Sequence, residues 1–596
     1  MPQASRAEAE HDARLAHLVP ALGWLPRYER RWLRGDLTAG IAVTALVVPK
    51  NLGYAEIAGV PVQNGLYAAA AGAIIYALFC TSRHISTGPS SSLAAVAGGA
   101  VIVTSLGGQQ AAQLVAAITL ATGVLFLLLA LFRMGWIAHF LSKAVVTGFL
   151  AGAAVDVVVG ELPKVTGTSS EGDSAWREFG TWLGSLGDVH GTTVLVGLIS
   201  LAVILVLRFL VPSAPGALVL VVGGLIASGL FDLGAHGVAL VGHVPRGLPA
   251  PALPSFTLVK DHYATIAIAA VALLLIGFSQ TAGDARAFAT RHRYRIDVNQ
   301  ESVAQGMANV GAGVFQGMPV STSLSASSLN ESAGAATPVA SLTTGVLVLA
   351  TLIVLAPVFS HLPKAVLGAV IIDAVVFGMI DIRELRRLYR VTRFDFWVAV
   401  AAIIGVLSAG VLAGVVIGVA LSLGWLIYVA TQPPMPVLGR EGGTQVFRDL
   451  DENPDDETFP GITVLRLDGG LFFATAEALD DRVRGLTEDG REMRALVLDL
   501  EGVDFIDSQG AAKLAELQES VKCNGGTLRL ARVKPPVLKV LDADGVRARL
   551  GDDHIHGNVD RAIEAQLTGD RALSSGRPDR TAVAVERSSP SGGAGL

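Results

Sequence analysis

The sequence predicts an α-helical polytopic membrane protein of about fourteen spans, built as an inverted repeat of about seven plus seven spans, followed by a small α/β domain. Three observations support this fold class. The 596 residues are 51% hydrophobic and only 16% charged, which is less charge than a water-soluble chain of this size carries. Apolar runs of about 20 residues, the length that crosses a bilayer, recur between residues 38 and 430. After residue 455, predicted strands alternate with predicted helices.

Composition divides the chain into five expected segments. Residues 1–36 are polar and form an N-terminal cytoplasmic segment, and residues 37–431 form the transmembrane domain. Residues 432–455 form a linker that contains Pro, Gly and acidic residues. Residues 456–567 form the α/β domain. Residues 568–596 are rich in Ser, Gly, Pro and Arg and are expected to be disordered.

The apolar runs define the transmembrane domain. The clearest of them are Ala112 to Phe132, Thr192 to Val211, Gly216 to Leu230, Tyr263 to Phe278, Val339 to Pro357 and Leu412 to Ala430. The first span begins near Thr38 and the eighth near Tyr263. The distance between them in the sequence matches the distance between two breaks rich in Gly, Pro and Ser, one in each half of the domain. An odd number of spans per repeat inverts the second half, which is the arrangement of many alternating-access transporters.

The two breaks are the candidate binding site. The first lies between Thr81 and Val96, and the second between Gly317 and Asn330. A kinked helix explains either break alone, but the pair favours a transporter site, where irregular backbone lines an enclosed cavity. A half-helix beginning near Val320 would direct its free N–H groups and positive dipole end toward an anion. The residues expected to contact this anion are Gly88, Pro89, Ser90, Ser91, Val320, Ser321, Thr322 and Ser323.

The placement of Lys and Arg predicts the orientation. Basic residues gather before the first span and in loops of one parity, whereas the short loops near Val60 to Asn64 and Gly107 to Gln113 carry none. Because cytoplasmic loops are enriched in Lys and Arg, we expect the N- and C-termini in the cytoplasm and the spans in the inner (plasma) membrane of the cell. The clustered residues are Arg27, Arg30, Arg31, Arg34, Arg286, Arg291, Arg293, Arg295, Arg383, Arg386, Arg387, Arg390 and Arg393.

The residue types also exclude several classes of protein. Only Cys80 and Cys523 are present, so no disulfide framework is expected. The HExxH, HxxEH, GxSxG and P-loop patterns are absent, and Cys and His do not cluster at metal-ligand spacing. We therefore expect no enzyme activity, no cofactor, no metal site and no nucleic-acid partner.

Passages spread over nearly the whole chain resemble the SulP family, the sulfate-permease-type anion transporters. In chain order these passages are WLRGDLTAGIAV, GYAEIAGVPVQNGLYAA, TSRHISTGPSS, HVPRGLPAPALP, NQESVAQGMANVGAG, LPKAVLGAVIIDAV and GVVIGVALSL. The later passage DLEGVDFIDSQGAAKL similarly resembles the signature of the STAS domain, which follows the membrane domain in this family.

The resemblance implies a core domain and a gate domain, with the substrate between half-helices three and ten and facing spans one and eight. It implies a secondary active transporter of small inorganic anions, sulfate first and bicarbonate next, with import coupled to protons or sodium. It also implies a homodimer in membrane lipid, with a STAS domain open to a cytoplasmic regulator. A passive anion channel, and a dicarboxylate or nucleobase transporter of the same architecture, stay open as alternatives.

Lys50 follows Pro49 and departs from the family pattern, which usually has Gln after this proline. A Lys near the bilayer centre costs about 2.5 to 3.5 kcal/mol on insertion scales, so its ammonium is expected to face a cavity or a carboxylate. Many relatives carry an Arg in the serine cluster of span ten, where this chain has Ala326. Our hypothesis is that Lys50 supplies that positive charge; snorkelling or a buried ion pair is the alternative. Tyr54, in the same interrupted segment of the first span as Lys50, is a further expected contact of the substrate.

Span eight carries two more candidate residues. Gln280 stands where cation-coupled relatives place a carboxylate and is expected in the binding site, and Asp284 follows one helical turn later on the same face. Asp284 is the candidate coupling group or a counter-ion of Lys50, and pairing with Arg286 is the alternative. In the STAS domain, Ser508 occupies a position that some free-standing STAS proteins phosphorylate, although we favour a helix N-cap as its role.

Overall fold

A computed structural model gives the fold and describes residues 19–133, 142–170, 172, 174–211, 215–242, 247–248, 250–488 and 493–575. Residues 1–18 of the expected N-terminal segment and residues 576–596 of the expected disordered tail lie outside the described residues. The chain divides into two compact units, residues 1–423 and residues 424–596, and each is described by itself.

The first unit is almost entirely helical. Its earlier helices are α2 (Ala21–Trp24), α3 (Leu33–Ile57), α4 (Val62–Phe79), α5 (Ser91–Thr104), α6 (Gly108–Leu131), α7 (Lys143–Thr166), α8 (Ala175–Gly184), α9 (Gly191–Leu210) and α10 (Gly216–Phe231). Its later helices are α11 (Phe256–Asp261), α12 (Tyr263–His292), α13 (Val298–Val314), α14 (Leu324–Ser332), α15 (Val339–Val354), α16 (Ala356–Phe359), α17 (Lys364–Met379), α18 (Ile382–Val391) and α19 (Arg393–Thr431).

Many of these helices suit a bilayer. Among the described residues, seven helical segments are long and apolar enough to cross a membrane, and α5, α10 and α15 are shorter apolar helices. This is the helical membrane fold that the sequence predicts, whereas the count of about fourteen spans stays a prediction. Within α19, Gly410 has a φ of 83°, a left-handed conformation that glycine adopts readily, so two helices meet there at a kink.

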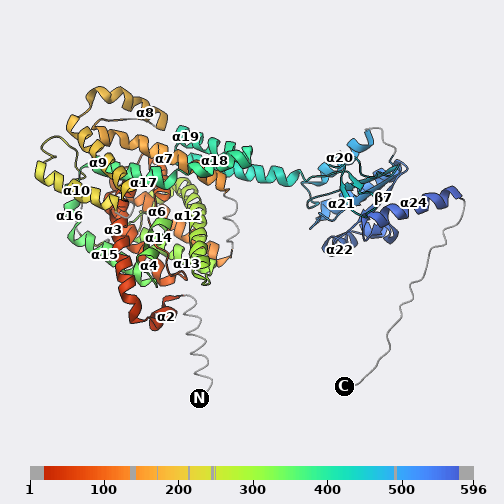
Figure 1. Cartoon of the computed structure of the whole chain (residues 1–596), viewed down its shortest axis with the longest axis horizontal. Helices are drawn as coiled ribbons and strands as arrows, with labels where there is room; N and C mark the ends of the chain where they lie inside the picture. Colours follow the sequence, from red (N-terminus) through yellow and green to blue (C-terminus); the bar gives the residue numbers. More distant parts are fainter. Residues whose placement is uncertain are drawn as a thin grey trace, which may run out of the picture. The chain divides into compact units, whose positions relative to one another are not determined.

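Helices from the two halves of the domain pack side by side. α13 packs against α4 and α6, and α15 packs against α3 and α4, so the red and green ribbons of Figure 1 interleave. A second group forms where α17 packs against α7 and α9. Gly98 lets α5 approach the end of α3, because a Cβ there would lie 2.1 Å from the carbonyl oxygen of Ile57. The two helices that carry the first candidate residues, α3 and α5, are therefore in close contact.

The second unit is an α/β domain on a four-stranded parallel sheet (Figure 1). Across the sheet the strands are β5 (Ile462–Arg466), β6 (Ala495–Asp499), β7 (Thr527–Ala531) and β8 (Ile555–His556). The helices are α20 (Ala476–Glu488), α21 (Ser508–Cys523), α22 (Pro535–Ala543), α23 (Val546–Leu550) and α24 (Val559–Ser575). In β6, Leu496 and Leu498 pack with residues of α20 to α23, whereas the alternate residues Ala495 and Val497 pack with α24 on the opposite face.

The expected linker and the start of the expected disordered tail both contain ordered elements. Within the expected linker, β3 (Leu438–Arg440) pairs antiparallel with β4 (Phe447–Asp449), and Arg448 forms an ion pair of 2.6 Å with Asp456. At the other end, α24 continues to Ser575, past the expected start of disorder at residue 568. Composition did not reveal the strand pair, because strand pairing and an ion pair between residues eight positions apart order a segment that is polar in sequence.

Candidate functional site

The two breaks meet at a short pair of strands. β1 (Thr87–Gly88) pairs antiparallel with β2 (Ser321–Thr322), so that Thr87 lies opposite Thr322 and Gly88 opposite Ser321. A half-helix begins directly after each strand. α5 is capped by Ser90, whose hydroxyl accepts from the N–H of Leu93, and α14 is capped by Ser323 in the same way. The N-termini of α5 and α14, each with N–H groups that lack a partner within the helix, therefore lie next to each other.

The second half-helix begins later than predicted. It begins at Leu324 rather than near Val320, because Ser321 and Thr322 must be extended to pair with β1. The backbone of Val320 is held by Asn309, whose side-chain oxygen accepts from its N–H at 3.0 Å and whose amide donates to its carbonyl at 3.0 Å. The hydroxyl of Ser321 donates to the carbonyl of Gly277 at 3.3 Å. Val320 and Ser321 thus anchor the break to α13 and α12, and neither lines the cavity described next.

A cavity of about 480 Å³ lies at the start of the two half-helices. It brings together nine of the predicted residues, namely Lys50, Tyr54, Pro89, Ser90, Ser91, Gln280, Asp284, Thr322 and Ser323. Its wall also includes Ser92, Leu150, Leu324, Ser325, Ser328, Ala374, Phe377, Gly378 and Met379. Gly88 lines a smaller adjoining space with Lys50, Tyr54, Pro89 and Ser323.

Lys50 is the cation of this cavity. It lies half-buried in the middle of α3, and among the described residues no carboxylate oxygen comes within 4.0 Å of its ammonium. The carboxylate of Asp373 is instead bound by both forks of the Arg208 guanidinium, each at 2.6 Å. Lys50, Arg208 and Asp373 together line a further space of about 210 Å³. Among the described residues Lys50 therefore forms no ion pair of 4.0 Å or less, although it lines the same space as Asp373 and Arg208.

Two side chains of α12 tie that helix to the breaks. Gln280 donates from Nε2 to the hydroxyl of Ser92 at 3.1 Å. Asp284 accepts from the hydroxyl of Thr322 at 2.8 Å through Oδ2. Among the described residues Asp284 has no ion pair with Lys50 or Arg286, so both expected pairings of this carboxylate are absent.

Sequence reasoning missed several polar groups at this site. Asn51, beside Lys50, is buried, and its Nδ2 has no hydrogen-bond partner among the described residues. The hydroxyl of Thr87 is also buried without a partner, and both residues line the small space with Lys50. A polar residue adjacent to Lys50 inside an apolar helix was a signal for Asn51. Arg208 was also missed, although it is the lone basic residue near the end of the apolar run of α9.

The donors of this cavity suit an anion. Lys50 contributes an ammonium, the serines contribute hydroxyls, and the two helix starts contribute N–H groups and positive dipole ends, while Asn51 offers an amide in the small adjoining space. No group of three or more His, Cys, Asp or Glu side chains that could hold a metal ion occurs in the described part of the chain. The donors named above can bind an anion by hydrogen bonds and charge.

Ser508 does not have the role that we favoured for it. The N-cap of α21 is Asp507, whose Oδ1 accepts from the N–H of Gly510 at 2.8 Å. Ser508 is the first helical residue and is exposed. Asp and Ser have similar N-cap preferences, so the sequence alone did not distinguish Asp507 from the following Ser508.

Known proteins match this chain over most of its length. A family model described as "Sulfate permease family" matches residues 33–402, and one described as "STAS domain" matches residues 453–562. A protein of Mycobacterium tuberculosis (strain CDC 1551 / Oshkosh) named as a probable sulfate transporter is 34% identical over 561 residues, which cover 92% of this chain and 99% of that protein. High affinity sulfate transporter 2 of Stylosanthes hamata is 28% identical over 572 residues, covering 92% and 86%.

A solved structure has the same fold. The murine solute carrier 26 family member A9 anion transporter, in the inward-facing state, superposes with a TM-score of 0.84 over 93% of this chain and 95% of that chain. The sequence identity is 23%, so this likeness concerns the fold alone.

Proposed function

Because the chain belongs to the sulfate permease family, we propose that it is a secondary active transporter of small inorganic anions, with sulfate as the first candidate for its substrate and bicarbonate as the next. The observation that carries this proposal is the strand pair β1–β2, which brings the starts of α5 and α14 to one cavity beside the unpaired ammonium of Lys50. The names of the relatives support sulfate ahead of bicarbonate.

In this proposal the anion lies at the capped ends of α5 and α14. Ser90, Ser91 and Ser323 offer hydroxyl groups, and Tyr54 and Lys50 of α3 contact the anion from the opposite side. Gly88 and Pro89 shape the wall, and Gln280 holds Ser92 in place. Val320 and Ser321 act as backbone anchors, and Thr322 links the site to Asp284.

Uptake by the purified full-length chain in proteoliposomes tests the function. Labelled sulfate is expected to accumulate above its external concentration when a proton or sodium gradient is imposed. A panel of unlabelled bicarbonate, chloride, succinate and uracil then ranks the alternatives by competition. Downhill flux with no accumulation under either gradient would replace the carrier with a passive anion channel, and inhibition by succinate or uracil alone would replace the substrate class.

We propose Asp284 as the coupling group. Its carboxylate accepts from Thr322 in β2 and lines the cavity, so a change in its charge acts directly on the backbone that positions α14. Asp284→Asn is expected to abolish the pH dependence of sulfate uptake and to leave equilibrium sulfate binding nearly unchanged. Asp261→Asn, at an exposed position of α11, is the matched control. Retained pH dependence in Asp284→Asn would rule out this role.

The setting of the protein is also a proposal. We propose a homodimer in the plasma membrane with both termini in the cytoplasm and the STAS domain, with its exposed Ser508, open to a cytoplasmic regulator. Cys523 is exposed and Cys80 is buried, so a thiol reagent should label Cys523 and thereby show on which side of the membrane the C-terminal domain lies. In intact cells a membrane-impermeant maleimide should leave Cys523 unlabelled until the membrane is opened. Labelling of intact cells would place the C-terminal domain outside.

A further inference from the structure

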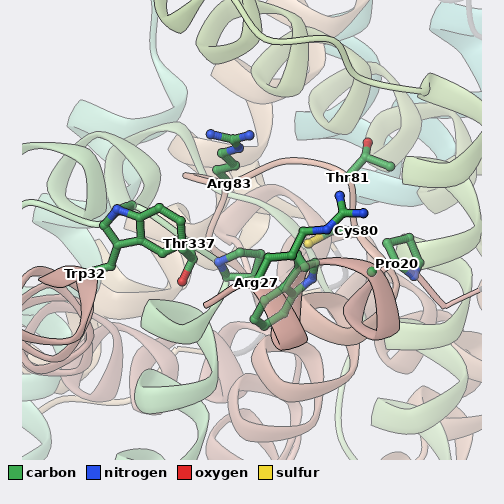
Figure 2. A pocket seen from close by; sticks show the side chains of 11 residues that line it. Pro20, Arg27, Trp32, Cys80, Thr81, Arg83 and Thr337 are labelled. Atoms are coloured by element: carbon green, nitrogen blue, oxygen red, sulfur yellow. The ribbon is translucent and has the colours of Figure 1, made fainter. Parts of the chain in front are cut away.

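A second polar cavity lies away from the anion site, at the N-terminal edge of the first unit. It has a volume of about 500 Å³ and is shown from close by in Figure 2. We call it the arginine–tryptophan pocket. It is lined by Pro20, Gly23, Trp24, Arg27, Trp32, Cys80, Thr81, Arg83, Ala336, Thr337 and Pro338. Three separate segments therefore build its wall: the region from α2 to the start of α3, the loop after α4, and the loop before α15.

The pocket carries two exposed arginine side chains, Arg27 and Arg83. Within the described residues, neither Arg27 nor Arg83 has a carboxylate within 4.0 Å, although Arg83 stacks on the ring of Tyr294 at 5.7 Å. The indole N–H of Trp24 is buried and has no hydrogen-bond partner among the same residues. A buried donor without a partner is costly, and guanidinium groups bind phosphate oxygens in a bidentate manner. These three groups are donors of the kind that binds phosphate oxygens.

Two carboxylates lie near the wall, but their hydrogen bonds are already used. Asp36 accepts from the N–H and the hydroxyl of Thr337, at 3.1 and 2.6 Å. Glu301 accepts from the N–H and the hydroxyl of Thr81, at 2.8 and 2.6 Å. Both carboxylates are fully buried, and neither lines the pocket. They fix the wall and leave the two guanidinium groups as the charged groups of its surface.

Exposed apolar side chains lie on the segments that build the pocket. Leu22 and Leu25, on α2 and the turn that follows it, are each 54% exposed, and farther along α3 Ile41 is 58% exposed. The pocket itself carries two Trp rings, which are typical of the boundary between lipid tails and water. Exposed apolar side chains beside a basic, aromatic cavity fit a ligand that is anionic at one end and apolar at the other.

We propose that the arginine–tryptophan pocket binds the phosphate group of an anionic membrane phospholipid. Arg27 and Arg83 hold the phosphate oxygens, the indole N–H of Trp24 donates to the same group, and the acyl chains leave along the exposed leucines. The bound lipid joins the loop that leads into β1 to the loop that follows α14. Its occupancy therefore stabilises both chain segments that carry the half-helices of the anion site.

Native mass spectrometry of the full-length chain in detergent tests this site. The probes are 1-palmitoyl-2-oleoyl-phosphatidylglycerol and the phosphatidylcholine with the same chains. Arg27→Gln/Arg83→Gln is expected to weaken phosphatidylglycerol binding by about tenfold or more, because charge-assisted hydrogen bonds are lost. The matched control is Arg30→Gln/Arg34→Gln, which removes the same charge from exposed positions outside the pocket and should change binding by less than about twofold.

A milder variant keeps the test decisive if the double variant folds poorly. Trp24→Phe retains the ring and removes only the N–H, and it should weaken phosphatidylglycerol binding by about threefold or more. If both double arginine variants lose the same affinity for phosphatidylglycerol, the lipid responds to the overall surface charge, and the proposed site is overturned. Equal affinity for phosphatidylcholine would also overturn it. Displacement of the lipid by millimolar inorganic phosphate would assign the pocket to a soluble phosphate and overturn the lipid proposal.

Discussion

Replacing Lys50 by Gln removes the positive charge of the anion site with little change in shape. No carboxylate of the described residues depends on Lys50 for an ion pair, because Asp373 is bound by Arg208 at 2.6 Å. The substitution therefore leaves no acid unpaired. Its effect is expected in anion binding, while the melting temperature of the protein should stay close to that of the wild type.

The magnitude follows from the kind of contact that is lost. A hydrogen bond that involves a charged group contributes about 1.5 to 3 kcal/mol. Since about 1.4 kcal/mol is a factor of ten, loss of the Lys50 contact should raise the Kd for sulfate about 10- to 150-fold. Lys260→Gln, at an exposed position of α11, removes the same charge far from any cavity wall described above and should leave the Kd within about twofold.

Equilibrium binding of labelled sulfate to the purified variants measures this change. A second substitution separates charge from local shape. Ala326 on α14 lines the same small space as Lys50, so Lys50→Gln/Ala326→Arg should recover much of the lost affinity. A Kd for Lys50→Gln equal to that of the wild type would refute the assignment of Lys50 to the anion. So would a loss that matches a fall in melting temperature, because the defect would then lie in folding.

Three further predictions concern the surroundings of the site and the second unit. Arg208→Ala leaves the largely buried carboxylate of Asp373 unpaired and should cost about 1 to 3 kcal/mol of stability, seen as a lower melting temperature in detergent; no shift would show that the pair is dispensable. Asn309→Leu removes both hydrogen bonds to the backbone just before β2, so sulfate binding and melting temperature should fall together. In the second unit, the hydrogen bonds from Arg448 lower the pKa of Asp456 below its usual 3.8. The carboxylate of Asp456 therefore contributes fully to stability above the pKa that it has in the unfolded chain, and this contribution is lost as the pH falls through its pKa in the folded protein. The stability of Asp456→Asn should respond less to acid than that of the wild type.

The sequence predicted the first break well because its signals are local. Gly88, Pro89 and Ser90 lie within three positions of each other, and a cap followed by an apolar run is a pattern of neighbouring residues. The start of the second half-helix was misplaced because it depends on a partner strand far away in the chain. Ser321 and Thr322 have the composition of a helix start, but pairing with β1 keeps them extended.

The sequence could not predict the partners of charged and amide side chains, because those partners also lie far away in the chain. Arg208 and Asp373 meet across 165 positions of sequence, and nothing local distinguishes Asp373 from another intramembrane acid. The opposite case is Ser508, where the competing cap Asp507 is the adjacent residue. There the sequence contained the answer, and the error came from choosing between two residues with similar capping preference.

The way in which the site is anchored bears on how it can open. The hydroxyl of Ser321 binds the carbonyl of Gly277 in α12, and Val320 is bonded through its backbone to Asn309 in α13, so the second break is fixed to the helices that pack with α4 and α6. Phe377 and Met379 form another part of the cavity wall, and they belong to α17, which packs with α7 and α9. Most of the hydrogen-bond donors thus lie on other helices than Phe377 and Met379, although α17 also packs against α3 and α5. A displacement of α17 against those other helices would change access to the cavity while the donors keep their positions, which is the mechanical requirement of a carrier with a fixed binding site.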